Sequence, residues 1–553
     1  MPRQLDLLLL TDEVYNAEFN RYNQFDDWQR SVFRALEFDA RDAELVHRRF
    51  GVEHYLVESN VLRPDGRRER LWIPIFPHRP SLALCDLATL ARHAGQRVAI
   101  VDNVLRYAFR RAQALELLRD SAPRLVGIST TFILSPAKVR AFVELVRQAS
   151  PASKIVLGGP TVRRDKSLHG VADFAVFGSG EQPLLEILEL LDGKRTHASL
   201  SHCAFVDEEK RVRYADAASE ETLVVGRAYR ARAGETIPVP DWSIYPRSRA
   251  NVHPIEFSRG CKYNCFYCSY DRGKNIRTQA DIRAELIQNA AHGITKYRLG
   301  DSNFTDGPPS APRYPHDVCK TMIELDLDLE WSCYARADDL TPELADTLKR
   351  AGCFAVFLGL ESGDDALLLQ MRKGHDSKAA LAGVEIAKRA GLFVHANFVV
   401  GYPGETESSY RKTLDLIVAS QPDTVTLGQF FVEDNAPVKS RAMAAAHGLE
   451  GSETRWSHST MDSAQADELI ARGHAELTDA GITLGNEFEI AAHMSAGMSF
   501  EENRRFFAWK RDLLDPSAPA GVREAAKLEL REIFLTRLPE AVGRDQQCMR
   551  SAT

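Results

Sequence analysis

Three of the nine cysteines of this 553-residue chain fall within eight positions of the stretch Ser258-Arg-Gly-Cys261-Lys-Tyr-Asn-Cys265-Phe-Tyr-Cys268. The spacing Cys-x3-Cys-x2-Cys allows three thiolates to bind three corners of a four-iron cube. Three ligands for four irons leave one iron open, and an open metal position is a site for a substrate or cofactor. A zinc knuckle and three unrelated core cysteines are the alternatives for this stretch.

The cysteine stretch follows the first of a series of predicted strands that alternate with helices. The predicted strands are His253–Ser258, Tyr297–Asp301, Glu330–Arg336, Ala355–Glu361, Val394–Gly401 and Thr424–Phe431, and the predicted helices are Ala280–His292, Pro312–Leu325, Pro342–Ala351, Lys378–Ala390 and Glu407–Ser420. Six consecutive βα units predict a parallel, partly open barrel, a partial (β/α)6 fold. The cysteines then lie at the carboxyl ends of the strands, where such barrels carry their chemistry.

An earlier alternation of strands and helices, from Leu7 to Leu191, predicts an α/β domain of the doubly wound, Rossmann-like type. Ligands of such sheets bind outside the carboxyl ends of the strands. Small or polar residues stand at the predicted ends, where a large ligand needs close approach to the backbone: Asp102, Ser129, Thr130, Gly158, Gly159, Gly178, Gly180 and Glu181.

A proline-marked segment, Ile237–Trp242, separates the two alternating regions, and the chain beyond residue 438 reads as mainly helical. We therefore expect three domains: residues 1–225, residues 226–438, and a helical C-terminal domain, residues 439–553, that caps the substrate.

The composition narrows the class of protein. The net charge of −7 gives no global attraction to nucleic acid or to an anionic membrane. The apolar run Leu7–Leu10 is far shorter than the roughly 20 residues of a membrane span. The six remaining cysteines are scattered singly, unlike a disulfide framework, so we expect a cytoplasmic, reduced protein. We expect no nucleic-acid or membrane partner, and a monomer.

The cysteine motif and the strand ends after it resemble the radical S-adenosylmethionine (radical SAM) superfamily. That resemblance implies a [4Fe–4S] cluster on Cys261, Cys265 and Cys268 whose open iron chelates S-adenosyl-L-methionine (AdoMet). It also implies an external electron donor such as flavodoxin or ferredoxin. The resemblance places Tyr267 near the adenine, and it places AdoMet-binding residues at the strand ends that hold Asp301, Arg336, Glu361, Ser362 and Gly401.

The first domain resembles the cobalamin-binding domain of class B radical SAM enzymes. The segments Leu125–Thr130, Ile155–Pro160 and Phe177–Glu181 match that pattern in order, although Ser179 stands where an acid is usual. The chain lacks the Asp-x-His-x-x-Gly motif that supplies a histidine to cobalt. Arg79 occupies the position where the family often places a residue under the corrin. It stays protonated and cannot coordinate cobalt; a solvated loop is the alternative for this residue.

These cofactors imply a methyltransferase that moves a methyl group from AdoMet through methylcobalamin to a small-molecule substrate. The nearest subgroups are tryptophan 2-C-methyltransferases and phosphinate P-methyltransferases of specialised metabolism, including antibiotic biosynthesis. The expected acceptor is therefore a carbon, for example an indole carbon of tryptophan, or a phosphinate phosphorus. Both a radical and a polar transfer fit. A cobalamin-dependent radical SAM cyclase or ring-rearranging enzyme is one alternative, and a non-catalytic cobalamin or iron–sulfur sensor is another.

Three residues are candidates for catalysis. Glu285 is a possible ligand of the open iron, with a surface carboxylate as the favoured alternative. His458, in Trp456-Ser-His458, can move a proton or belong to a helix-capping loop. Tyr314 is a candidate base, with a packed loop aromatic as the alternative.

Overall fold

The computed structural model describes residues 5–12, 27–52, 55–62, 68–74, 80–133, 135–215, 239–245, 251–270, 272–433 and 436–551. The chain divides into two compact units. The N-terminal unit comprises Met1–Phe19, Pro80–Arg247 and Cys548–Thr553. The barrel unit comprises Asn20–Arg79 and Ser248–Gln547.

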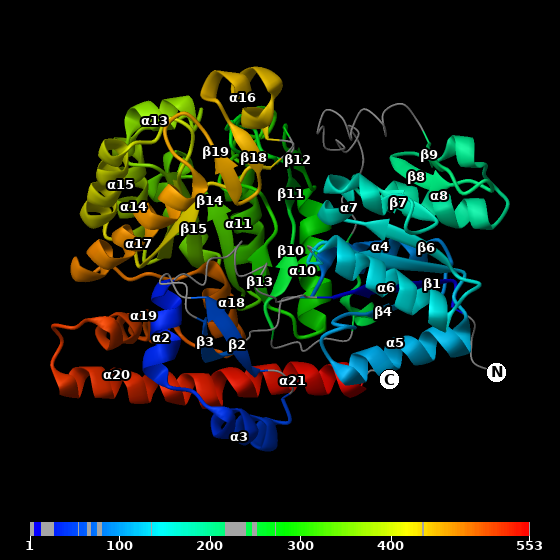
Figure 1. Ribbon diagram of the computed structural model, residues 1–553, viewed down its shortest axis with the longest axis horizontal. Helices are drawn as coiled ribbons and strands as arrows, with labels where there is room; N and C mark the ends of the chain where they lie inside the picture. Colours follow the sequence, from blue (N-terminus) through cyan, green and yellow to red (C-terminus); the bar gives the residue numbers. More distant parts are fainter. Residues whose placement is uncertain are drawn as a thin grey trace. The chain divides into compact units, whose positions relative to one another are not determined.

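The N-terminal unit is built on a sheet of order β4-β1-β5-β6-β7-β8-β9. The strands are β1 (Leu7–Thr11), β4 (Val98–Val101), β5 (Leu125–Ser129), β6 (Lys154–Gly158), β7 (Phe174–Val176), β8 (Cys203–Val206) and β9 (Val212–Tyr214). The first five are parallel, and their order is the flavodoxin-like 2-1-3-4-5 arrangement, whose ligand site lies where the order reverses, beside β1 and β5. The helices are α4 (Leu82–His93), α5 (Ala108–Ser121), α6 (Pro136–Ala149), α7 (Pro160–Arg164) and α8 (Glu181–Leu191) (Figure 1).

Strand β1 lies between β4 and β5 in this sheet, and both of its faces are covered. All five residues of Leu7–Thr11 are buried, as expected for a parallel strand with helices on each side. Strands β8 and β9, which the sequence did not predict, extend the sheet in antiparallel orientation.

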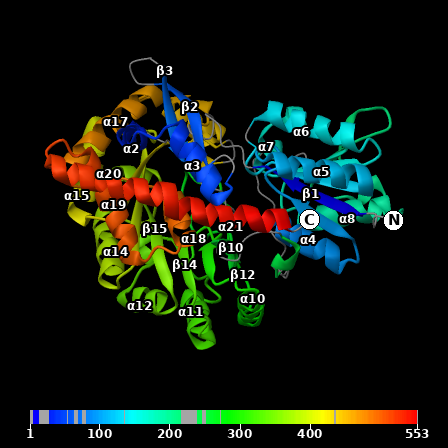
Figure 2. The same cartoon turned by 90° about the horizontal axis from the view of Figure 1, so that it is seen from below.

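The barrel unit contains a second sheet, of order β10-β13-β14-β15-β16-β17, in which every pairing is parallel. The strands are β10 (His253–Ile255), β13 (Lys296–Leu299), β14 (Glu330–Ala335), β15 (Cys353–Glu361), β16 (Phe393–Val400) and β17 (Thr424–Gln429). The connecting helices are α10 (Gln279–Ala291), α11 (Tyr314–Leu325), α12 (Pro342–Arg350), α14 (Ser377–Arg389) and α15 (Glu407–Ser420), and they form an arc around the strands in Figure 2. The predicted partial barrel is confirmed.

Further elements complete the barrel unit. They are α2 (Asp27–Leu36), α3 (Ala40–Phe50), the hairpin β2–β3 (Leu56–Leu62 and Arg68–Pro74), β11 (Ser258–Arg259), β12 (Asn275–Ile276), α13 (Asp365–Gln370), α16 (Arg441–His447), the hairpin β18–β19 (Glu450–Ser452 and Arg455–Ser457), α17 (Ser463–Asp479), α18 (Glu487–Ser495), α19 (Phe500–Leu514), α20 (Ala520–Glu532) and α21 (Leu538–Ser551). Among these the sequence predicted α17 and α19, and it did not predict the segment from α2 to β3.

The two-unit division differs from the three domains expected from the sequence, because the C-terminal helices share a core with the barrel. The ring of Phe507 on α19 lies 5.7 Å from that of Phe393 on β16, and the ring of Phe500 lies 5.8 Å from that of Phe354. Residues 20–79 join the same unit through aromatic contacts with Phe534. Packing of these aromatic rings stabilises the barrel unit, and a C-terminal domain folded separately from the barrel would lack these contacts.

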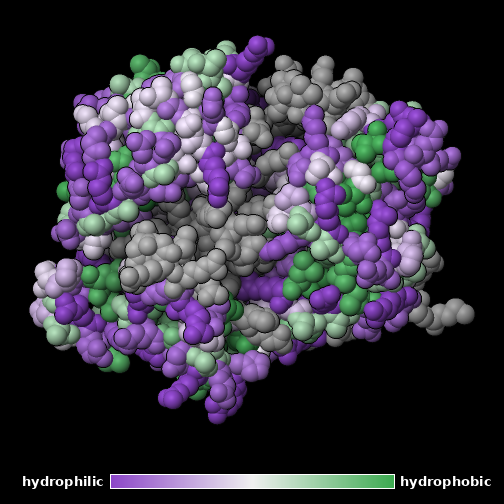
Figure 3. Space-filling view, in the orientation of Figure 1, coloured by the Kyte–Doolittle hydropathy of each residue, from purple (hydrophilic) through white to green (hydrophobic). Residues whose placement is uncertain are grey.

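Hydrophilic residues cover most of the described surface on the face shown in Figure 3, and hydrophobic ones occur there in small groups. Within the described ranges, no helix combines the length and the apolar character needed to span a bilayer.

We predict that Gly401→Ala destabilises the barrel. Gly401 has φ +92°, and a Cβ atom there lies 2.5 Å from Cη2 of Trp456. The left-handed backbone costs a non-glycine residue about 1–3 kcal/mol, and the steric overlap adds to that cost. We expect a lower midpoint of thermal unfolding. Gly391→Ala is the control, because Gly391 has φ +74° but a Cβ atom there meets nothing closer than Cε of Lys349 at 3.8 Å. Equal midpoints for the two variants would contradict the steric part of the argument.

Candidate functional site

A cavity of about 410 Å³ opens in the barrel unit, and Cys261, Cys265 and Cys268 all line it. The other lining residues come from the loop after β11, from β14 to β17 and the loops that follow them, and from the start of α18, with further ones after β13, after α13 and in the hairpin β18–β19. The volume lies within the range of roughly 300–1,000 Å³ typical of small-molecule sites. The structure therefore brings the cysteine motif and several strand ends together around one space.

The cysteine loop begins at a buried anchor. Asp301, directly after β13, accepts a hydrogen bond from the backbone N–H of Phe257 at 3.0 Å and another from the hydroxyl of Ser258. Burial raises the pKa of Asp301, and these hydrogen bonds oppose that shift. Asp301 was predicted to bind AdoMet, but it does not line the cavity. Its contacts hold the strand from which the loop departs.

The loop itself is wrapped around the guanidinium group of Arg272. Arg272 donates to the backbone carbonyls of Tyr263 at 2.7 Å, Cys265 at 3.0 Å and Cys268 at 3.3 Å. These carbonyls belong to no helix or sheet ladder, so a side-chain donor satisfies them. The thiols are thus presented by a loop that is held in place.

The thiols fit an iron–sulfur cluster chemically. Burial raises the pKa of Cys261, and it raises the pKa of Cys268 to about 11. Metal ligation supplies the positive charge that a buried thiolate needs. Among the described residues, no three metal-ligating side chains converge on the position of a single ion. A cube is bound differently, because each thiolate ligates a separate iron.

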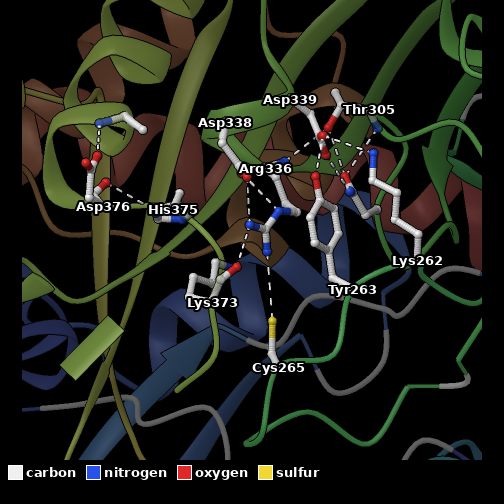
Figure 4. A network of polar contacts seen from close by, with 12 residues as sticks. Lys262, Tyr263, Cys265, Thr305, Arg336, Asp338, Asp339, Lys373, His375 and Asp376 are labelled. Carbon is white, nitrogen blue, oxygen red and sulfur yellow. Dashed lines mark hydrogen bonds and ion pairs between the residues drawn. The ribbon is translucent and has the colours of Figure 1, made fainter. Parts of the chain in front are cut away.

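Arg336, after β14, lies against the cysteine loop (Figure 4). Its Nη1 is 3.8 Å from Sγ of Cys265, and its guanidinium group packs 3.6 Å from the centre of the Tyr263 ring. The neighbouring Asp339 accepts from the Tyr263 hydroxyl at 2.5 Å. The end of β14 thus contacts the loop at two of its residues.

A second polar group lines the cavity at the end of β15. Glu361 accepts from the Tyr267 hydroxyl at 2.9 Å and pairs with Nζ of Lys373 at 2.9 Å. Glu361 has φ +68° and follows an irregularity in the pairing of β15 with β16. A positive φ strains the backbone of a non-glycine residue, and such strain occurs mainly at functional sites, where the surrounding structure maintains it. Burial and then the Glu361 charge raise the pKa of Tyr267, which keeps its proton.

Polar residues that the sequence analysis missed also line the cavity. His395 on β16 contacts Thr424 Oγ1 through Nδ1 at 2.8 Å and Asn397 Oδ1 through Nε2 at 3.2 Å. Burial lowers the pKa of His395 to about 4, so the ring is neutral. The presence of polar residues inside the otherwise apolar run Phe393–Val400 could have indicated that His395 and Asn397 belong to the site.

Glu487, at the start of α18, also lines the cavity. Its carboxylate accepts from Arg298 at 2.8 Å and from the Tyr334 hydroxyl at 2.7 Å. The guanidinium group of Arg298 lies 4.4 Å from the centre of the Phe357 ring. The sequence did not indicate that Glu487 belongs to this site, because α18 lies far along the chain from the cysteine motif.

The three candidate catalytic residues lie outside the cavity lining. Glu285 is fully buried and paired with Arg277, so the expectation of a surface carboxylate is wrong. Burial raises the pKa of Glu285 to about 7 despite that pair. The Tyr314 hydroxyl donates to the carbonyl of Phe257 at 2.7 Å. His458 contacts the carbonyl of Gly401 at 2.9 Å and stacks on Trp456.

Two predicted AdoMet-binding residues likewise make contacts away from the cavity. The Ser362 hydroxyl lies 3.2 Å from Thr413 Oγ1. The N–H of Gly401 donates to the carboxylate of Glu405. Gly401 directly follows β16 with φ +92°, and a Cβ atom there would lie 2.5 Å from Cη2 of Trp456. Both residues shape strand ends, while Arg336, Glu361 and Tyr267 face the cavity.

In the N-terminal unit, the predicted ligand residues gather at adjacent strand ends. Thr130 donates to the carbonyl of Gly158 through its N–H at 2.7 Å and its hydroxyl at 2.9 Å. Gly159 has φ +110°, and a Cβ atom there lies 3.0 Å from Thr130 Oγ1. By contrast, a Cβ atom on Gly158 meets no atom of the described part of the chain within 4 Å, which leaves room for a ligand against the backbone.

Other residues predicted for this ligand have mixed placements. Ser129 ends β5, with its hydroxyl 3.0 Å from Thr131 Oγ1. Gly178 and Gly180 precede α8, which begins at Glu181. Asp102 is buried and accepts from Arg110 at 2.5 Å and from the Tyr245 hydroxyl at 3.1 Å, so it is engaged within the protein. Arg79 lies outside the described residues.

Comparison with known proteins identifies both regions. Residues 255–417 match the model of the radical SAM superfamily, and residues 79–188 match that of the B12 binding domain. The chain therefore carries a radical SAM domain and a B12-binding domain, and a [4Fe–4S] cluster, AdoMet and cobalamin are the cofactors of these domains.

Two curated relatives share more than half of the chain. An uncharacterised methyltransferase of Pyrococcus horikoshii is 24% identical over 351 residues, which are 61% of this chain and 72% of the relative. An anaerobic magnesium-protoporphyrin IX monomethyl ester cyclase of Synechocystis is 24% identical over 360 residues, which are 63% of this chain and 69% of the relative.

Two solved structures share the fold. The radical AdoMet methyltransferase TsrM from Kitasatospora setae, solved with cobalamin and a [4Fe–4S] cluster, is 19% identical, with a TM-score of 0.55 over 81% of this chain and 80% of that one. The cobalamin-dependent AdoMet radical enzyme OxsB, solved with aqua-cobalamin and AdoMet, is 14% identical, with a TM-score of 0.62 over 99% of this chain and 80% of that one.

We predict that Cys265→Ala abolishes assembly of the cluster, because two thiolates leave half of the cube without a protein ligand. Iron content and the EPR signal of the anaerobically reconstituted, reduced protein measure this. Cys353→Ala is the matched control, since Cys353 is buried on β15 and lies outside the cavity lining. A full complement of about four irons in Cys265→Ala would contradict the cluster site.

We predict that Gly158→Leu weakens cobalamin binding at least tenfold, about 1.4 kcal/mol, without lowering the thermal unfolding midpoint. A Cβ atom at this position meets no atom of the described residues within 4 Å, so the side chain extends into the space where the ligand approaches. Absorbance titration of the full-length protein with cobalamin measures the affinity. Gly521→Leu, at an equally open position on α20, is the control. Wild-type affinity in Gly158→Leu would exclude this strand end from the ligand site.

Proposed function

We propose that this protein is a cobalamin-dependent methyltransferase that methylates a small molecule at the expense of AdoMet. One observation carries the proposal: a single cavity is lined both by the three cysteines of the radical SAM motif and by aromatic and amide side chains at the strand ends. The cofactors supply a methyl-carrying cobalt and, at the cluster, the reductive cleavage of AdoMet. Similarity to a methyltransferase of Pyrococcus horikoshii and the shared fold with TsrM support this reaction.

The protein's own residues bind and orient the reactants. The carboxylate of Glu361, held by Lys373, suits the hydroxyl and amino groups of AdoMet, and the Tyr267 ring stands beside it. Because burial keeps the Tyr267 hydroxyl protonated, it acts as a hydrogen-bond donor rather than a base.

The charges that line the cavity favour an aromatic amino-acid substrate over a phosphinate. The lining cations Arg272, Arg336 and Lys373 all contact the cysteine loop. The rest of the lining offers the neutral His395, several amides, aromatic rings and the carboxylate of Glu487, which pairs with Arg298. An anionic phosphorus group is recognised by Arg or Lys, so this part of the lining suits a neutral or zwitterionic substrate such as tryptophan.

A cyclase remains the second candidate, because a tetrapyrrole cyclase is among the relatives. The cavity of about 410 Å³ also has to hold part of AdoMet, and a tetrapyrrole is larger than AdoMet. The size of the cavity in the barrel unit therefore favours methylation of a smaller molecule. The flavodoxin or ferredoxin donor, the monomeric state and the cytoplasmic location stay predictions.

We predict that the anaerobic holoenzyme supplied with AdoMet, a low-potential reductant and L-tryptophan forms a product heavier by one CH2 group, measured by mass spectrometry. Formation of S-adenosylhomocysteine without 5′-deoxyadenosine indicates polar transfer, and equal amounts of the two indicate the radical route. A P–H phosphinate is the comparison substrate, and its preferential methylation would contradict the assignment made from the lining charges. A product of unchanged carbon count, with loss of hydrogen alone, would favour the cyclase.

A further inference from the structure

The geometry points to Arg336 as a residue that sets the reduction potential of the cluster, through a hydrogen bond from Nη1 to Sγ of Cys265. Those two atoms lie 3.8 Å apart, within hydrogen-bonding distance for sulfur. The inference rests on the cluster site described above, and it assigns Arg336 a role beyond contact with AdoMet.

The guanidinium group of Arg336 is held on several sides (Figure 4). Nε and Nη2 donate to the two carboxylate oxygens of Asp338, each at 2.9 Å, and Nη2 also donates to the carbonyl of Lys373 at 2.5 Å. The Tyr263 ring covers one face at 3.6 Å. These contacts hold the guanidinium group from the other side and leave Nη1 directed at the sulfur.

The position of Arg336 is also protected from water. Only 5% of the residue is exposed, and Cys265 is the most buried of the three motif cysteines, at 6%. A charge-assisted hydrogen bond is stronger in such surroundings than in water. A guanidinium group is not deprotonated in proteins, and Asp338 pairs with that of Arg336 at 2.9 Å, so the side chain stays cationic.

The three cysteines differ in their donors. Sγ of Cys268 accepts from the backbone N–H of Tyr270 at 3.5 Å, which is a neutral donor. Sγ of Cys265 faces a guanidinium group. Of these two sulfur contacts, the one to Cys265 has the charged donor. That donor, Arg336, lies outside the cysteine loop, at the end of β14.

The consequence for the cluster is electrostatic. Reduction adds one electron to the cluster and its sulfur ligands, with no proton transfer and no change in covalent bonds. Hydrogen bonds to the sulfurs and nearby cations stabilise the more negative, reduced form and raise the potential. Asp338 offsets part of the charge of Arg336, so the directed N–H···S bond carries most of the effect. Arg336 is a positioning residue in this role, acting through the ligand Cys265.

The test is an EPR-monitored redox titration of the reconstituted full-length protein, without substrate, using titanium(III) citrate as reductant. We expect Arg336→Gln to lower the ratio of reduced to oxidised cluster at a fixed poise by about tenfold, which is about 59 mV for a one-electron couple. Arg336→Lys keeps a cation without the planar fork, so we expect a smaller decrease.

Arg372→Gln is the matched control. Arg372 is exposed and lies 5.5 Å from the Phe266 ring, so its loss removes one charge close to the loop without removing a bond to sulfur. A wild-type potential in Arg336→Gln, or an equal shift in Arg372→Gln, overturns the inference. If Arg336→Gln holds no cluster, Arg336→Lys decides: a lowered potential supports the inference and an unchanged one overturns it. Failure of the cluster site itself is distinguished by a full cluster in Cys265→Ala.

Discussion

The guanidinium group of Arg272 donates to the carbonyls of Tyr263, Cys265 and Cys268, and the rest of the site depends on this interaction. Beyond a bridge between Cys261 and Arg272, the described part of the cysteine loop pairs with no strand, and buried carbonyls without donors are costly. A planar fork bridges several acceptors at once, which the compact ammonium group of lysine cannot do with the same geometry. The loop therefore keeps one conformation, and its three thiols face the cavity.

The parallel sheet supplies the remaining residues of the site. Because its strands run in one direction, their carboxyl ends meet at one edge, and Arg336, Glu361 and Asn397 reach the same cavity from β14, β15 and β16. The N-terminal unit repeats this logic with Ser129 and Gly158 at the ends of β5 and β6. Both units thus place ligand chemistry where parallel strands end.

Much of the architecture was predictable because hydrophobic periodicity marks parallel strands strongly. The prediction for β1 matched Leu7–Thr11, and the predicted barrel strands all correspond to strands or strand segments. Strands β8 and β9, which extend the sheet to one of its edges, were missed because short antiparallel strands carry a weaker pattern. The domain division differed because Phe500 and Phe507 pack on barrel residues, and the distance along the chain gives no hint of that contact. Glu285 looked like a surface acid because its partner Arg277 is recognisable only once α10 is folded.

The sequence by itself determined the cysteine spacing, the two alternating α/β regions and the glycines at their strand ends, because each is a local pattern along the chain. Only the tertiary structure decided which strand-end residues share the cavity. Glu361 and Arg336 face it, while Asp301, Ser362 and Gly401 turn to internal partners. It alone brought His395 and Glu487 there. The physical reason is that the direction of a side chain depends on strand twist, local backbone strain and the partners that packing supplies, and none of these is encoded within a few neighbouring residues.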